Sequence, residues 1–154
     1  MVSGQLRIRP AALGDFPRWS ALWESYNAFY GRVGPTALPL ETTQATWSRF
    51  FDAAQPSHAL VAERDGELVG LAHYLFHLST LQIPPICYLQ DLFTAEPHRG
   101  QGIGRALIQA VYEQARTAGT GKVYWQTHET NAASRKLMDK IADRSEYILY
   151  RKLL

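Results

Sequence analysis

The 154-residue chain has only one cysteine, Cys87, and therefore cannot form an internal disulfide. This scarcity fits a reducing compartment, and we expect a cytoplasmic protein. No apolar run approaches the roughly 20 residues that a membrane span needs, and residues 1–10 lack the apolar centre of a signal peptide. Blocks of like charge are also missing, because 16 Lys and Arg are interspersed with 14 Asp and Glu. We therefore expect neither a membrane nor a nucleic acid as partner.

Hydrophobic residues make up 46% of the chain, which is enough for a single domain spanning 1–154. Periodicity and turn residues predict the elements in chain order. The first half contains a strand in 5–11, a helix from Phe16 to a stop at Gly31, a helix in 41–56 and a hairpin in 58–76 that turns at Asp65 and Gly66. The second half contains a strand at 86–94, a helix from about 104 to 118, a strand at 122–127, a helix at 131–142 and a strand at 146–154. Asp15 is the expected cap of the first helix, and Thr42 or Thr43 that of the second. This order predicts an α/β fold with a mixed sheet.

A glycine-rich turn, RGQGIGRAL, joins the strand at 86–94 to the following helix. Unpaired amides and the dipole at the start of a helix attract phosphate, and glycine lets the anion approach closely. Arg99 and Arg105 flank the turn and add positive charge. The Walker pattern is excluded because Arg105 follows the last glycine, and the same arginine breaks the dinucleotide fingerprint. A plain tight turn is the alternative, but the combination Arg99-x-x-Gly102-x-Gly104 favours a pyrophosphate loop.

This loop resembles the acetyl-coenzyme A loop of the GNAT acyltransferases, and the order of expected elements is similar to the GNAT fold from end to end. YLQDLF, VYWQTHETNAASRKLMDKIA and LWESYNAFY resemble the branch with the fungal histone and D-amino-acid acetyltransferases, and spermidine/spermine acetyltransferase more distantly. The resemblance implies a mostly antiparallel mixed sheet with helices on both faces, in which the strand around 90–94 splays from that around 124–128.

The resemblance also implies that acetyl-CoA is the cosubstrate and that the acetyl group moves directly to a primary amine, without a covalent enzyme intermediate and without a metal. Backbone groups near Leu92 and Thr94 are expected to pair with the pantetheine arm and to polarise the thioester carbonyl. Asn131 is expected on the same arm, unless it serves only as a helix cap. The expected cofactor-binding residues are Leu92, Phe93, Thr94, Arg99, Gly100, Gln101, Gly102, Ile103, Gly104, Arg105, Asn131 and Ser134.

The chemistry requires a neutral amine, and an alkylammonium of pKa ~10.4 costs about 4–5 kcal/mol to deprotonate at neutral pH. Gln90 stands where spermidine/spermine acetyltransferase has a catalytic glutamate, and an amide cannot act as a base. Its neighbour Asp91 can act as one, but successive strand residues face opposite sides unless a bulge intervenes. Glu129 is a third catalytic candidate. Met138 aligns with the tyrosine that protonates the leaving thiolate in many relatives, so that role falls to solvent or to another group, or is lost.

The acceptor site is less defined in the sequence. Tyr26 and Tyr30 are expected either to wall the acceptor pocket or to belong to the core, and Glu129 either guides a cationic amine or is a solvated loop residue. His128 has a pKa suited to proton transfer, although a structural role is more common for a lone histidine. His73 and His77 share a face of one strand, but without a third ligand we expect no metal site.

We therefore predict an N-acetyltransferase for a small amine, polyamine or amino acid. The alternative is an acetyl-CoA-binding or protein-lysine-acetylating GNAT module with weak catalysis, which the pairing of Gln90 with Met138 motivates. The apolar tail 148–154, ILYRKLL, suggests a homodimer.

Overall fold

The computed structural model describes residues 4–154. Its strands form one sheet in the order β1 (Arg7–Pro10), β2 (Ser57–Arg64), β3 (Glu67–His77), β4 (Ile86–Thr94) and β5 (Val123–Tyr124). The first four strands pair in antiparallel fashion, whereas β5 joins β4 in parallel. The mixed, mostly antiparallel sheet predicted from the sequence is therefore confirmed.

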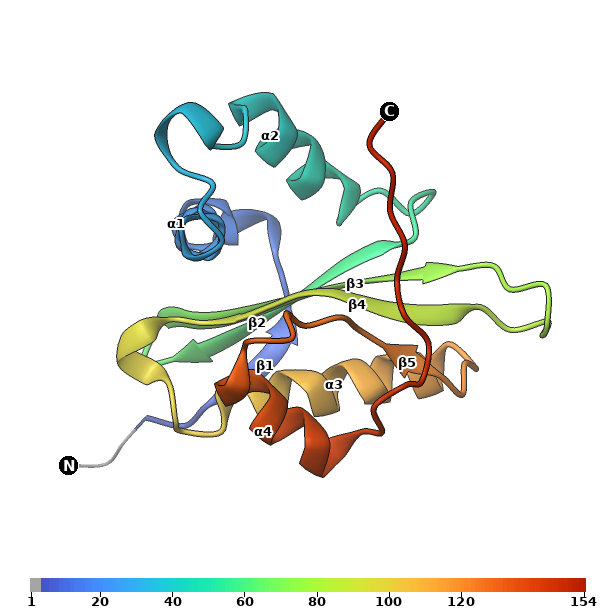
Figure 1. Ribbon diagram of the computed structural model, residues 1–154. Helices are drawn as coiled ribbons and strands as arrows, with labels where there is room; N and C mark the ends of the chain where they lie inside the picture. The colour runs from blue at the N-terminus through green and yellow to red at the C-terminus, as the bar shows by residue number, and fades with distance from the viewer. Residues whose placement is uncertain (1–3) are drawn as a thin grey trace.

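The helices cover both faces of this sheet (Figure 1). Helices α1 (Phe16–Phe29) and α2 (Leu40–Arg49) lie over one face, and α3 (Ile103–Thr117) and α4 (Ala132–Ile141) lie over the other. Short 3-10 turns occupy Leu13–Asp15, Gly34–Thr36 and Glu96–His98. None of the helices in residues 4–154 is both long and apolar enough to cross a bilayer.

A hydrophobic core fills each side of the sheet. Under α1 and α2 it is aromatic, because every third or fourth residue along α1 is large, and its members are Trp19, Leu22, Trp23, Tyr26, Trp47, Val61, Leu68, Leu71 and Phe93. Under α3 it is mainly aliphatic, with Leu107, Ile108 and Val111 fully buried. These two cores hold β3 and β4 rigidly at the centre of the molecule.

A β-bulge interrupts β4 at Gln90. His73 of β3 pairs with Asp91 and Tyr74 pairs with Leu89, so Gln90 is an extra residue without a partner on β3. The extra residue shifts the alternation of the strand. Leu89 consequently packs into the core under α3, while Asp91 faces α1 and α2.

Strands β4 and β5 separate soon after they pair. Their ladder contains only Cys87 with Val123 and Tyr88 with Tyr124, and β5 ends there. The rest of β4, through Thr94, therefore passes beyond β5, which confirms the expected splay. Its outer edge retains backbone groups that β5 does not cover.

Two local expectations are wrong, and a third is confirmed only in part. Helix α2 begins at Leu40, directly after Pro39, so neither Thr42 nor Thr43 caps it. Asp15 is the N-cap residue of α1, as expected, but its side chain makes no cap hydrogen bond to that helix, because its carboxylate is engaged by two arginines. The predicted strand at 146–154 does not form: the segment has neither helix nor strand and is exposed throughout. A strand needs a neighbouring backbone to pair with, and none of the strands in residues 4–154 pairs with this segment.

Candidate active site

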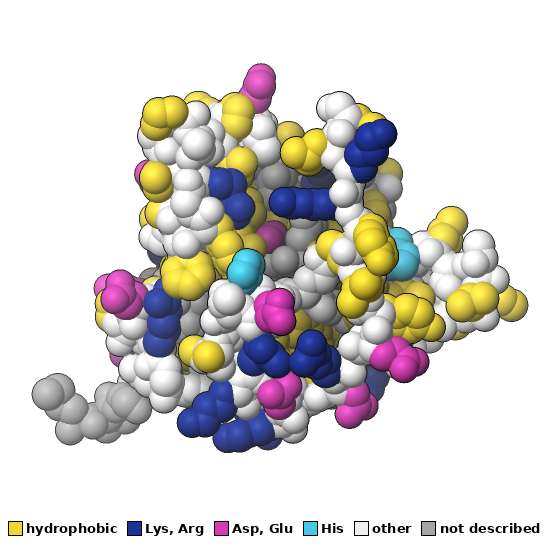
Figure 2. All heavy atoms as spheres, in the orientation of Figure 1, with side chains coloured by type: hydrophobic (Ala, Val, Ile, Leu, Met, Phe, Trp, Pro, Cys, Tyr) yellow, Lys and Arg dark blue, Asp and Glu magenta, His cyan; other side chains and the backbone are white. Residues whose placement is uncertain are grey.

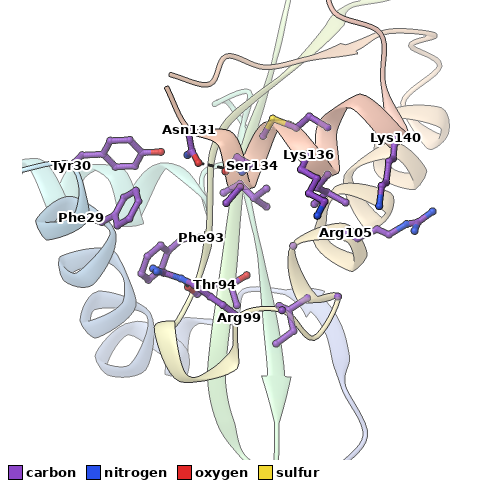
Figure 3. A pocket seen from close by; sticks show the side chains of 18 residues that line it. Phe29, Tyr30, Phe93, Thr94, Arg99, Arg105, Asn131, Ser134, Lys136 and Lys140 are labelled. Carbon is purple, nitrogen blue, oxygen red and sulfur yellow. Dashed lines mark hydrogen bonds between the residues drawn. The ribbon is translucent and has the colours of Figure 1, made fainter. Parts of the chain in front are cut away.

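A first cleft of about 760 Å³ lies between β4, the turn before α3, and α4 (Figure 3). All the expected cofactor-binding residues except Gln101 line it. The side chain of Gln101 instead turns toward β2, where it accepts a hydrogen bond from Arg64. The segment 92–105, helix α4 and the end of α1 are thus brought together around one space.

The turn before α3 is shaped for an anion. Gly100 (φ 75°) and Gly102 (φ 80°) both adopt the left-handed conformation, which is costly for any residue with a Cβ. The first helical bond of α3 is donated by the amide of Ala106 to the carbonyl of Gly102, at 3.0 Å. The preceding amides, from Ile103 to Arg105, have no acceptor within the helix. Because they line the cleft, they form the type of site that binds phosphate.

Several cations surround the same cleft, but they differ in how they are held. Arg99 is tied to the end of β4, since its Nε donates to the carbonyl of Thr94 at 3.0 Å and its guanidinium lies over Phe93. Arg105, Lys136 and Lys140 lie along α3 and α4 at the edge of the cleft (Figure 3). Sequence reasoning missed both lysines, although their i, i+4 spacing on the predicted helix places them on one face.

Helix α4 presents Asn131, Ser134 and Met138 to the first cleft. Asn131 is the N-cap of this helix, because its side-chain oxygen accepts from the amide of Ser134 at 3.2 Å. The capping role and a place in the cleft are therefore compatible. Met138 occupies the position expected for the group that protonates the leaving thiolate, and its thioether cannot donate a proton.

A second cleft of about 550 Å³ lies between α1, α2 and the centre of the sheet. Gln90 and Asp91 both line it, together with Tyr26, because of the bulge in β4. Figure 2 shows a hollow on this face, with basic side chains around it and an acidic side chain recessed within it. The alternative that Asp91 faces away from Gln90 is therefore wrong.

Asp91 is held by a buried chain of hydrogen bonds. The hydroxyl of Tyr26 donates to one carboxylate oxygen at 2.7 Å, and Nδ1 of His73 lies 3.0 Å from the other. The indole N–H of Trp19 donates to Nε2 of His73 at 2.9 Å. Because an indole can only donate, Nε2 is the acceptor, and the neutral ring carries its proton on Nδ1, facing Asp91.

The donors to Asp91 are neutral, and the cleft still reaches its carboxylate. Burial, and secondarily the charge of Asp91, raises the pKa of Tyr26 well above its ordinary value, so the phenol stays protonated. The side chain of Asp91 is 13% exposed. Its charge is therefore oriented by the protein, and no arginine or lysine within residues 4–154 forms an ion pair with it.

The remaining sequence candidates are placed as follows. Tyr26 belongs to both the core and the second cleft, whereas Tyr30 lines the first cleft. Glu129 is exposed and lines neither cleft. His128 bonds locally to Thr130. No cluster of three metal-ligating side chains occurs within residues 4–154.

Two arginines that sequence reasoning missed, Arg32 and Arg49, also line the second cleft. Arg32 follows α1 and Arg49 ends α2. They are 17 residues apart in the chain, in segments with no motif, and only the packing of α1 and α2 on the sheet brings them to one cleft. No local signal in the sequence could have paired them.

Comparison with known proteins agrees with this geometry. A family model described as Acetyltransferase (GNAT) family matches residues 19–142. D-amino-acid N-acetyltransferase HPA3 of Saccharomyces cerevisiae is 32% identical over 154 residues, which cover 99% of this chain and 93% of the yeast protein. Two solved structures share the fold. AAC(6')-Iy in complex with the bisubstrate analogue CoA-S-monomethyl-acetylneamine has a TM-score of 0.81 and 19% identity, over 97% of this chain and 99% of that one. Ribosomal-protein-alanine N-acetyltransferase from Brucella melitensis biovar Abortus 2308 has a TM-score of 0.77 and 21% identity, over 97% of this chain and 100% of that one. The chain therefore belongs to the GNAT acetyltransferase family and is an N-acetyltransferase that uses acetyl-CoA.

Proposed function

We propose that the protein transfers the acetyl group of acetyl-CoA, held in the first cleft, directly to the primary amine of a small acceptor in the second cleft. The observation that carries this proposal is the course of β4. Gln90 and Asp91 line the second cleft, and the next three residues, Leu92 to Thr94, line the first. One strand thus connects both clefts, and an amine beside Asp91 is within a few residues of the strand edge that faces the thioester.

The residues of the first cleft fit acetyl-CoA. The free amides from Ile103 to Arg105 suit the pyrophosphate, and Arg105, Lys136 and Lys140 supply compensating positive charge. The edge of β4 that β5 leaves uncovered offers backbone groups to the pantetheine arm, and an amide there can polarise the thioester carbonyl. Acetyl-CoA supplies the activated acetyl group, while the protein's part is to hold and orient it.

In this proposal Asp91 handles the amine. Its carboxylate attracts the incoming ammonium and accepts the proton that leaves, either directly or through a water molecule. Gln90 has no such capacity, and Glu129 lies outside the cleft. Once the neutral amine attacks the carbonyl, its nitrogen loses a second proton to water, the carbon–sulfur bond breaks and the thiolate takes a proton from solvent. A thiol of pKa ~8.5 leaves without a strong acid, so Met138 slows the reaction without preventing it.

The test is acetyl-CoA-dependent thiol release with a panel of amino acids, polyamines and lysine peptides, with products weighed by mass spectrometry. We expect an acceptor that gains one acetyl group, at a rate that saturates with acceptor concentration. Coenzyme A binding by calorimetry, with no acetylated product from any amine, would contradict the proposal. It would favour the alternative of a binding module with weak catalysis, which Gln90 and Met138 together motivate.

We also propose a homodimer, on the strength of the exposed C-terminal segment. Six large apolar residues in it are more than two-thirds exposed: Tyr147, Ile148, Leu149, Tyr150, Leu153 and Leu154. An apolar segment of this length is costly in water and suits pairing with a second copy. Light scattering at micromolar concentration that gives the mass of one chain would contradict this proposal.

A further inference from the structure

Arg32 lines the second cleft, where a hydrogen bond holds its side chain and no carboxylate within residues 4–154 pairs with its charge. Its Nε donates to the side-chain oxygen of Asn27 at 2.6 Å, and the side-chain amide of Asn27 is itself anchored to the carbonyl of Trp23 at 2.8 Å. The guanidinium lies 5.7 Å from the ring centroid of Tyr26 and 5.5 Å from that of Tyr30. Neither terminal nitrogen of Arg32 has an acceptor within residues 4–154. The group is therefore oriented in advance for an anion from outside.

Arg49 brings a second unneutralised guanidinium to the same cleft. It is the last residue of α2, and in the described part of the chain it forms no ion pair or side-chain hydrogen bond. Asp91 is the one carboxylate among the residues that line this cleft. Two guanidiniums against one carboxylate leave an excess of positive charge, which an acceptor that is only cationic cannot balance.

The opposite charges stand one tyrosine ring apart. Tyr26 contacts both of them, because its hydroxyl donates to Asp91 and its ring lies beneath Arg32. Tyr26 therefore places a carboxylate and a guanidinium in the same cleft, which suits a ligand that carries both an ammonium and a carboxylate. Leu38 and Phe50 line the remainder of the cleft and offer apolar surface to a side chain.

We infer that the acceptor is a free α-amino acid, whose ammonium is received by Asp91 and whose carboxylate is received by Arg32 and Arg49. The inference rests on the proposed function and assigns specificity within it. A bidentate contact between a guanidinium and a carboxylate gives both strength and direction, and it presents the amine on the side of β4. Polyamines and polycationic sugars lack the anion and meet like charge at both arginines. A lysine side chain within a protein also lacks it.

The test compares phenylalanine, phenylalaninamide and spermidine as acceptors at saturating acetyl-CoA. The amide keeps the amine and the side chain of phenylalanine and lacks only the carboxylate. We expect kcat/KM for phenylalanine to exceed that for the amide by about tenfold to a hundredfold, the range of a hydrogen-bonded charge. Arg32→Gln and Arg49→Gln should each lower kcat/KM for phenylalanine, mainly by raising KM, and should not lower kcat/KM for the amide, which has no carboxylate for them to bind.

Arg116→Gln is the matched control, because Arg116 is exposed on α3, far from the cleft. It should behave like the unmodified protein with every acceptor. Equal or faster transfer to the amide or to spermidine would overturn the inference and leave the proposed function intact. Transfer to none of many acceptors would instead contradict the proposed function. Because Arg49 is exposed, its substitution tests the inference even if Arg32→Gln disturbs the fold.

Discussion

Asp91 and Asp15 are both carboxylates held by several donors, but the chain uses their charges differently. Asp15 receives Arg9 at 2.6 and 2.9 Å and Arg18 at 2.6 Å, so its charge is neutralised within the fold. Among residues 4–154, the side-chain partners of Asp91 are a phenol and an imidazole, Tyr26 and His73. The charge of Asp15 therefore serves stability, whereas that of Asp91 remains accessible from the second cleft.

The ion pairs of Asp15 predict acid-sensitive stability. Hydrogen bonds from Arg9 hold the pKa of this carboxyl well below its usual range. A lowered folded-state pKa contributes stability that is complete above the unfolded value of about 3.9 and is lost as pH falls below it. Asp15→Asn should lower the free energy of unfolding by about 1.5–3 kcal/mol at pH 7. Urea unfolding at pH 7 and pH 3.5 measures both effects.

The difference between Asp15→Asn and the unmodified protein should shrink at pH 3.5, because the native carboxyl then begins to lose its advantage. Asp143→Asn is the control, since Asp143 is exposed beyond α4. If Asp15→Asn lowers the free energy of unfolding by the same amount at both pH values, the lost stability does not come from the charge of Asp15.

Sequence reasoning identified site residues where the signal is local. The glycines before α3 and the polar residues of β4 are contiguous with the elements that place them, and their spacing is legible in the chain. Arg32 and Arg49 could not be found this way, because α1 and α2 meet only through packing on the sheet. Glu129 shows the opposite limit of sequence reasoning, because it is near the splay in sequence but lines neither cleft.

At the scale of elements, β4 combines a correct prediction with a feature that the pattern hides. The bounds of this strand, Ile86–Thr94, are those predicted from its apolar and aromatic residues. The bulge in β4 cannot be predicted from those residues, because its position depends on the pairing register with β3. The face on which Asp91 lies therefore depended on β3, and only the folded chain could settle it.

The predicted strand at 146–154 fails for a related reason. Its composition favours a strand, but strand formation requires a second backbone at the right place, and sequence composition carries no information about that partner. Hairpin β2–β3 succeeds because its partner is adjacent and the turn at Asp65 and Gly66 is encoded locally, with both residues at positive φ. Local pairing was predictable and distant pairing was not.

The start of α3 gives a prediction for an element. Gly102 adopts φ 80° directly before the helix, and alanine in that conformation costs about 1–2 kcal/mol. Gly102→Ala should lower stability by that amount and weaken coenzyme A binding, because relief of the strain moves the free amides. Gly121→Ala is the control, since an added Cβ there meets nothing within 4 Å and Gly121 lacks a positive φ. Calorimetric coenzyme A affinity equal in both variants would contradict the role of the turn.

At the scale of the whole molecule, the two clefts share β4 and the end of α1, and different helices complete each of them. The turn before α3 and helix α4 form the first cleft, and α1 and α2 cover the second. The sheet between them is anchored by a core on each face, so β4 can hold both clefts in a fixed relation. Pre-organisation of this kind lets a small enzyme bring an amine and a thioester together.

The most direct test of this account is the rate of acetyl transfer by Asp91→Asn, measured beside Asp143→Asn and the unmodified protein with the best acceptor of the panel. We expect kcat/KM to fall by about 100- to 10,000-fold in Asp91→Asn alone, while the affinity of this variant for coenzyme A is unchanged. A rate within a few-fold of the unmodified protein would contradict the central claim that β4 delivers the amine to the thioester through Asp91.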